Sequence, residues 1–312
     1  MDQKSTAPAD RVVVGVDGSP GARAALDWAL AEAARRQSPL EVVAAFPVDF
    51  YWIDPLLENP ARIEEIRADT ERLTRELVTG ARAAAGRDVD VTVTVVAGAA
   101  SEHLVQRSRD AALLVVGSRG RGGVRSTLLG SVALHCAAHA ACRVVVVHPG
   151  AVAAPARVVV GVDESDTAGA VVRAAAEAAA ALGAELHAVT AVTVPDYWTE
   201  AYVFEVREFT RMREAAQTAA ERLVAEVLGD RPDLRVQVRA LDGPPQDVLV
   251  RQAAGAALLV VGSRSRSRLA GMVLGSVALH AVVHAPCPVL VVHPDTVPEA
   301  GRDTTALAAA GS

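Results

Sequence analysis

The chain has 312 residues, enough for two domains of ordinary size; 51% of them are hydrophobic, and the formal net charge at pH 7 is −6. The negative charge argues against a duplex-DNA partner, because DNA binding relies on a basic surface that neutralises phosphates. Residues 1–10 lack the apolar segment of a signal peptide and no run of about 18 apolar residues occurs, so we expect a cytoplasmic protein with no membrane partner.

Short β-branched apolar runs alternate with longer alanine-rich stretches, which is typical of βαβ units and of parallel sheets buried on both faces. Ser19 and Pro20 are a favourable N-cap and first residue for a helix. The predicted strands of the first half lie near 11–17, 40–46, 91–97, 112–117 and 143–148. The predicted helices of this half lie near 20–36, 60–85, 99–109 and 130–140.

The same order of elements returns in the second half, and the heptapeptide RVVVGVD occurs both at 11–17 and at 157–163, which indicates a tandem duplication. The second set of strands is predicted near 157–163, 185–191, 235–241, 257–262 and 288–293. The second set of helices is predicted near 167–182, 200–229, 244–254 and 275–284. We therefore expect a flexible segment at 1–10, a first domain at 11–150, a linker at 151–156, a second domain at 157–294 and a mobile tail at 295–312.

A glycine-rich segment follows the fourth predicted strand of each half, as GSRGRGGVRSTLLGSVA at 117–133 and GSRSRSRLAGMVLGSVA at 262–278. Glycine has no Cβ, so its backbone can approach an anion closely. The free N–H groups and the partial positive charge of a following helix N-terminus can then hold phosphate oxygens. The pattern predicts a phosphate site in each half, with Ser265 in the second copy where the first has Gly120.

Asp17 and Asp163 end the first predicted strand of each half, beside the glycine-rich segment in a doubly wound sheet. A carboxylate there can accept a hydrogen bond from a ribose hydroxyl or an adenine amino group. The alternative is an Asx turn that closes the strand-to-helix loop, since GVDGS is favourable turn chemistry.

Arginines and serines of the glycine-rich segments have two interpretations. The arginines are candidates to contact phosphates, although exposed loop arginines are often simply solvated; they are Arg119, Arg121, Arg125, Arg264, Arg266 and Arg268. Ser131 and Ser276 can equally cap a helix without any ligand. Lys4 is the only lysine, so no Walker-type lysine is present to meet a phosphate.

Other side chains with chemical potential recur in both halves. The pairs His135/His139 and His280/His284 have helical spacing, but we favour packing or capping over metal binding, and His148 and His293 are interpreted as strand ends. The cysteines are expected to be reduced and buried: Cys136, Cys142 and Cys287. The aromatic pairs Tyr51-Trp52 and Tyr197-Trp198 either cover an adenine ring or anchor their own loops.

At these residues the chain closely resembles the universal stress protein family, in a tandem two-domain form. The family's Gly-x2-Gly-x9-Gly-[Ser/Thr] motif, which marks its ATP-binding branch, coincides with Gly117, Gly120, Gly130 and Ser131. The likeness covers residues 11–149 and 157–294. It implies an α/β fold of two tandem Rossmann-like domains of the adenine nucleotide alpha hydrolase-like type, each a five-stranded parallel sheet of order 3-2-1-4-5 flanked by helices.

The resemblance also implies ATP as the ligand, with or without Mg²⁺, with adenine near Asp17 and Pro47 and phosphates on Gly130 and Ser131. The implied binding residues of the first half are Gly15, Asp17, Pro47, Val116, Gly117, Ser118, Arg119, Gly120, Arg121, Gly130, Ser131 and Val132. Those of the second half are Gly161, Asp163, Val261, Gly262, Ser263, Arg264, Ser265, Gly275, Ser276 and Val277. Ser265 adds a Cβ where the family has glycine, which predicts weaker binding in the second half.

In the family, the fifth strand usually pairs across a dimer axis, so the two halves are expected to pair within one chain as a pseudo-dimer, with a homodimer as a further possibility. The leading hypothesis is an ATP-binding stress-response regulator whose nucleotide occupancy biases a conformation or a partner contact. The alternatives are a slow ATPase or nucleotide-transferring enzyme on the same fold, and an oligomeric scaffold with vestigial sites. Fast hydrolysis is not expected, because the motif lacks an evident general base and a Walker lysine.

Overall fold

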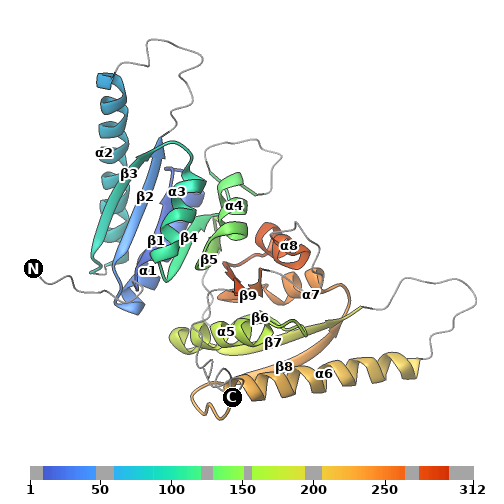
Figure 1. Ribbon diagram of the computed structural model, residues 1–312. Coiled ribbons are helices and arrows are strands. Elements are labelled where there is room, and N and C mark those ends of the chain that lie inside the picture. The colour runs from blue at the N-terminus through green and yellow to red at the C-terminus, as the bar shows by residue number, and fades with distance from the viewer. Residues whose placement is uncertain are drawn as a thin grey trace, which may run out of the picture.

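A computed structural model describes residues 10–46, 60–86, 88–120, 129–150, 157–193, 206–263 and 274–294 (Figure 1). In the first half, the strands are β1 (Val12–Val16), β2 (Leu40–Phe46), β3 (Val91–Ala97), β4 (Leu113–Gly117) and β5 (Arg143–Val147). The helices between them are α1 (Pro20–Arg36), α2 (Pro60–Ala85), α3 (Ala100–Arg107) and α4 (Ser131–His139).

The second half repeats this order. Its strands are β6 (Arg157–Gly161), β7 (Glu185–Val192), β8 (Val236–Asp242), β9 (Leu258–Gly262) and β10 (Val289–Val292). Its helices are α5 (Ala168–Leu182), α6 (Val206–Leu228), α7 (Pro245–Gln252) and α8 (Ser276–His284). Among the described helices, none is both long and apolar enough to cross a membrane.

Every strand and helix predicted from the periodicity is present, and where both ends are described they differ from the prediction by at most two residues. The predicted start of α1 is confirmed, because Ser19 accepts a hydrogen bond from the N–H of Ala22 at 3.1 Å and Pro20 is the first helical residue. The predicted helix near 200–229 is described only from Val206. The predicted linker 151–156 and tail 295–312 lie outside the described residues.

All ten strands form one sheet, in the order β3-β2-β1-β4-β5-β10-β9-β6-β7-β8. Each half keeps the order 3-2-1-4-5 with parallel pairs, but the two halves do not form separate sheets. Strand β5 pairs antiparallel with β10, with Val145 opposite Leu290. The pairing satisfies the backbone groups of two strands that would otherwise be exposed edges.

Helices cover both faces of the sheet, as Figure 1 shows. Val12 and Val14 belong to a core cluster with α1, α2, α5 and α6, whereas Val13 belongs to a second cluster with Leu104 of α3 and with α4, α7 and α8. Both clusters contain residues of both halves. The hydrophobic core is therefore continuous across the β5–β10 junction on either side of the sheet.

Two histidines connect the halves across this junction. His148, just after β5, contacts the carbonyl oxygen of Val282 in α8 through Nε2 at 2.9 Å, and His293, just after β10, contacts that of Ala137 in α4 at 3.0 Å. Because a carbonyl only accepts, each Nε2 carries the proton. Burial is the main cause that lowers the pKa of His148. These residues thus do more than end their strands.

Candidate functional site

A cavity of about 590 Å³ opens at the carboxyl ends of β1 and β4. Here the strand order reverses, since β2 lies on one side of β1 and β4 on the other, and such a switch point is where open α/β sheets bind ligands. The predicted residues that line it are Gly15, Asp17, Val116, Gly117, Arg119, Gly120, Gly130, Ser131 and Val132. Pro47 and Arg121 lie outside the described residues.

One wall of the cavity is apolar and was not predicted from the sequence. It is formed by Val43 and Ala45 of β2, Ala100 and Leu104 of α3, and Leu129 before α4. A Cβ on Gly15 would lie only 2.7 Å from Leu104 Cδ1, so glycine lets this leucine pack against the sheet. An apolar wall of this kind suits a flat aromatic ring.

The N-terminus of α4 also lines the cavity. Its N-cap residue is Gly130, which has no side chain to accept from the first-turn N–H groups, and no side-chain capping bond is made there. Ser131 is the first helical residue, so it does not cap the helix as the ligand-free alternative supposed; Ser276 occupies the same position in α8. The backbone of Ser131, Val132 and Ala133 lines the cavity with the positive end of the helix dipole.

Asp17 forms the Asx turn of one interpretation, while its hydrogen bond to a nucleotide stays a prediction. Its Oδ1 accepts from the N–H of Ser19 at 2.9 Å, which is the expected Asx turn. Its Oδ2 faces the glycine-rich segment, since a Cβ built on Gly120 would lie 2.5 Å from that oxygen. The turn therefore fixes a carboxylate at the edge of the cavity, and glycine at position 120 leaves room for it.

Gly117 is needed for a different reason from the one expected. A Cβ at Gly117 would lie 2.6 Å from the carbonyl oxygen of Gly21, and a Cβ at Gly21 would overlap the carbonyl oxygen of Arg119. The Ser19 hydroxyl also donates to the Arg119 carbonyl, at 3.3 Å. The glycine-rich segment thus packs backbone to backbone on the start of α1. Gly21 was not predicted as a functional residue, although a glycine directly after Pro20 inside the first helical turn is a signal in the sequence.

Ser118 does not reach the cavity. It is fully buried, its N–H donates to the carbonyl of Val147 at 2.8 Å, and its own carbonyl accepts from the N–H of Gly130 at 2.8 Å. Ser263 makes the same pair of bonds, to Val292 and from Gly275. The backbone of each serine holds the end of one strand against its neighbour and sets the start of the following helix, and the predicted contact of these serines with a ligand stays a prediction.

The second half differs at the loop after its first strand. Thr167 stands where the first half has Gly21, and α5 begins only at Ala168, whereas α1 begins at the residue equivalent to Asp166. The Ser165 hydroxyl lies 2.5 Å from Asp163 Oδ1 and 3.2 Å from Thr167 Oγ1, so it bonds within its own loop. Thr167 thus carries a Cβ where the first half has the glycine whose Cβ would overlap the Arg119 carbonyl oxygen.

The remaining predicted residues of the second half lie in several different places. Glycine at 161 again makes room for a leucine, because a Cβ there would lie 2.8 Å from Leu249 Cδ1. A cavity of about 240 Å³ that includes Asp163 lies against α6, on the sheet face opposite to α7 and α8. Arg264 and Ser265 lie outside the described residues, and the others end β9 or begin α8: Val261, Gly262, Ser263, Gly275, Ser276 and Val277.

Within each recurring histidine pair, the two imidazole rings pack against each other. The rings of His135 and His139 stack with centroids 4.4 Å apart, and those of His280 and His284 have the same separation. Among the described residues, no group of three or more His, Cys, Asp or Glu side chains has the geometry to hold a metal ion.

The cysteines are free and buried, as predicted. Burial raises the pKa of Cys136, Cys142 and Cys287 to about 12, so all three remain thiols at neutral pH. The aromatic pairs Tyr51-Trp52 and Tyr197-Trp198 lie outside the described residues.

Comparison with known proteins gives a consistent set of likenesses. The model of the universal stress protein family matches residues 8–148 and 156–293. Two universal stress proteins of Mycobacterium tuberculosis are each 33% identical to the chain, one over 289 residues (88% of this chain and 93% of the relative) and one over 293 (90% and 95%). The crystal structure of a universal stress protein from Archaeoglobus fulgidus superimposes with a TM-score of 0.64 at 22% identity, covering 91% of this chain and 98% of that one.

Proposed function

The chain belongs to the universal stress protein family, and from this premise we propose that it binds ATP in the cavity of its first half and acts as a nucleotide-dependent regulator of the stress response. The observation that carries the proposal is that an uncapped helix N-terminus and an apolar wall line the same cavity of about 590 Å³. A nucleotide is a ligand with an anionic end and a flat, mostly apolar end, and it needs both features at once.

In this proposal the phosphates lie at the N-terminus of α4, held by the backbone N–H groups of Ser131 and Val132. Arg119, which also lines the cavity, supplies the positive charge that a lysine supplies in other nucleotide sites. The adenine lies against Leu104 and Val43, and Asp17 accepts a hydrogen bond from the ribose or from the base. Where Mg²⁺ accompanies the nucleotide, it neutralises phosphate charge. Pro47 and Arg121 complete the proposed site.

We propose binding rather than rapid turnover. Asp17 is the only carboxylate among the described lining residues, and its Oδ1 is already engaged by the N–H of Ser19. General acid–base hydrolysis needs a base within reach of the attacking water and a group to stabilise the leaving phosphate. A multiple-turnover assay with ATP and Mg²⁺ is expected to give at most a slow rate, and rapid phosphate release would replace the binding proposal by an enzymatic one.

Isothermal titration calorimetry of the full chain with ATP tests the binding itself. We expect a saturable heat, and competition titrations with ADP and cyclic AMP then define which phosphate arrangement the site prefers. Mass spectrometry of nucleotide that copurifies with the protein identifies the ligand independently. No saturable heat at millimolar ATP, in protein shown to be free of bound nucleotide, would overturn the proposal.

A pair of matched variants locates the binding. A Cβ at Gly130 would have its nearest protein atom at 3.5 Å, an ordinary contact, so Gly130→Ala is expected to fold normally while its methyl group occupies the cavity. ATP affinity should fall in Gly130→Ala and stay close to wild type in Gly275→Ala, the equivalent change in the second half. The reverse pattern would place the main site in the second half.

A further inference from the structure

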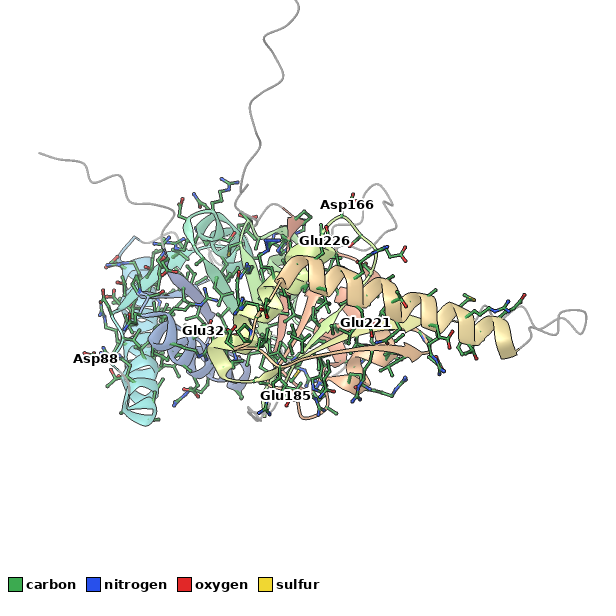
Figure 2. All side chains as sticks on the ribbon, turned by 90° about the horizontal axis from the view of Figure 1, so that it is seen from below. Glu32, Asp88, Asp166, Glu185, Glu221 and Glu226 are labelled. Atoms are coloured by element: carbon green, nitrogen blue, oxygen red, sulfur yellow. The ribbon has the colours of Figure 1, made fainter. Side chains whose placement is uncertain are left out.

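Another cavity, of about 320 Å³, lies between α1 and α5 over the β5–β10 junction, on the sheet face opposite to the proposed nucleotide site. The two helices lie on either side of the junction. Figure 2 shows Glu32 of α1 where the ribbon of the first half meets that of the second. Neither the family relationship nor the proposed function accounts for this cavity.

The floor of this cavity is apolar and comes from both halves. The first half contributes Leu113 of β4 and Val145 of β5, and the second half contributes Leu258 of β9 and Leu290 of β10. Trp28 of α1 adds an aromatic side chain to the wall. Ala174, Ala178 and Ala181 form the side that belongs to α5. An apolar ligand body would therefore be in contact with protein over most of its surface.

One rim of the cavity is charged. Arg36 and Arg35 both pair with Glu32, the former at 2.6 Å, and Arg143 of β5 pairs with Glu177 of α5 at 2.6 Å. The described lining residues thus include three guanidinium groups and two carboxylates. Asp10 also acts on Arg36, and Arg231, which is itself paired with Asp233 at 2.9 Å, acts on Glu177, so the surplus of one positive charge belongs to the lining residues alone.

The charged rim is not a consequence of the duplication. The α5 residues that correspond to the polar and aromatic residues of α1 are small or aliphatic: Ala174 for Trp28, Ala181 for Arg35 and Leu182 for Arg36. The side of the cavity formed by α1 is therefore polar, and the side formed by α5 is mostly apolar. Arg36 lies exposed at the rim and pairs with Glu32; burial is the main cause that lowers its pKa, and Asp10 and Glu177 act in the opposite direction. A ligand anion would find the positive charge already in place.

We propose that this cavity binds a small amphipathic monoanion, a carboxylate on an apolar body, with the carboxylate at Arg36 and the body over the junction. At roughly 30 Å³ per non-hydrogen atom the cavity holds about ten such atoms, the size of a medium-chain fatty acid. Such a ligand would contact both halves and so stabilise their association.

Octanoate, with 1-octanol and n-octylamine as neutral and cationic counterparts of the same length, tests the charge. Titrations of the full chain are followed by calorimetry and by the fluorescence of Trp28, with Trp28→Phe to identify the optical signal. We expect saturable octanoate binding, with an affinity about tenfold or more higher than that of 1-octanol. The affinity for octanoate should fall about tenfold in Arg36→Gln. It should not change in Arg173→Gln, the control, because Arg173 is an exposed residue of α5. Equal affinity for octanoate and octanol, or no saturable binding, would overturn the proposal.

Filling the cavity tests its location. Ala178→Leu places a larger side chain in it, whereas Ala180→Leu makes the same change on an exposed position of α5. Octanoate binding should be lost in the first variant and kept in the second, while ATP binding is unchanged in both. If Ala178→Leu binds octanoate like wild type, the ligand lies elsewhere and the proposal is wrong. If Ala178→Leu fails to fold, the comparison of Arg36→Gln with Arg173→Gln decides.

Discussion

Gly21 and Gly117 lie in backbone contact although one begins the first helix and the other ends the fourth strand. A Cβ at Gly117 would meet the backbone of Gly21, and a Cβ at Gly21 would overlap the carbonyl oxygen of Arg119, two residues after Gly117. Glycine in a phosphate loop is usually explained by the close approach of its backbone to the ligand. Gly130 fits this explanation, because the protein has room for a Cβ at this position and so does not itself require glycine there. Gly117 and Gly21 instead hold the segment that carries Arg119 against α1.

Gly21→Ala is therefore expected to displace the Arg119 carbonyl and with it the rim of the nucleotide cavity. The free energy of unfolding should fall by about 1–3 kcal/mol, as for other overpacked sites, and ATP affinity should fall with it. Chemical denaturation and calorimetry measure the two effects. Gly80→Ala is the control: Gly80 lies in α2, only Arg23 comes near its Cβ, at 3.9 Å, and alanine there should stabilise the helix by about 0.5–1 kcal/mol. If Gly21→Ala had the same free energy of unfolding and the same ATP affinity as wild type, the close contact of Gly21 with the Arg119 carbonyl would be contradicted.

At the scale of elements, the start of α4 differs from the start of α1 in a way that matters for function. The side chain of Ser19 caps α1, and its N-terminus packs on the glycine-rich segment, whereas α4 begins at Gly130 with no side-chain cap and faces the cavity. A helix start that makes no bond of its own is available to an anion. The local sequence predicted both helix starts closely, but which one faces a cavity depends on how the helices pack on the sheet.

Ser131→Glu tests the helix N-terminus directly. A carboxylate at the first helical position interacts favourably with the helix dipole, so the stability of the fold should stay within about 1 kcal/mol of wild type or rise. The same negative charge repels phosphates, so ATP affinity should fall by about tenfold or more in calorimetry. Ser276→Glu, the equivalent change in α8, should leave the first-half site intact. ATP binding that survives Ser131→Glu would show that the phosphates lie elsewhere.

Across the whole molecule, the two halves are joined by the β5–β10 pair, by the ion pair of Arg143 with Glu177, and by the reciprocal contacts of His148 and His293. Each histidine follows the last strand of its half and reaches a helix of the other half. For His148, burial lowers the pKa and so favours the neutral ring in this arrangement. The association of the halves therefore includes a partly buried imidazole whose protonation is linked to folding.

The lowered pKa of His148 predicts how stability changes with pH. In the unfolded chain the imidazole takes up a proton below about pH 6.5, whereas in the folded chain it resists protonation to a lower pH. The stability that depends on the neutral ring is thus complete above pH 6.5 and declines as the pH falls toward the pKa of the folded state. Urea denaturation between pH 7.5 and 5 should show this decline, and it should be smaller in His148→Gln, whose amide can still donate to Val282. An identical pH dependence in both proteins would contradict the assignment.

The order of strands and helices, the duplication and the position of the glycine-rich segments were all determined by the sequence alone, because periodicity, turn residues and repeated heptapeptides are local signals. The antiparallel β5–β10 junction and the contact of Gly21 with Gly117 depend on the tertiary structure. So do the apolar wall around Leu104, the burial of Ser118 and the charged cavity beside Arg36. Each of these brings together segments far apart in the chain, where local pattern carries no information and only the packing of helices on a shared sheet decides which side chains meet.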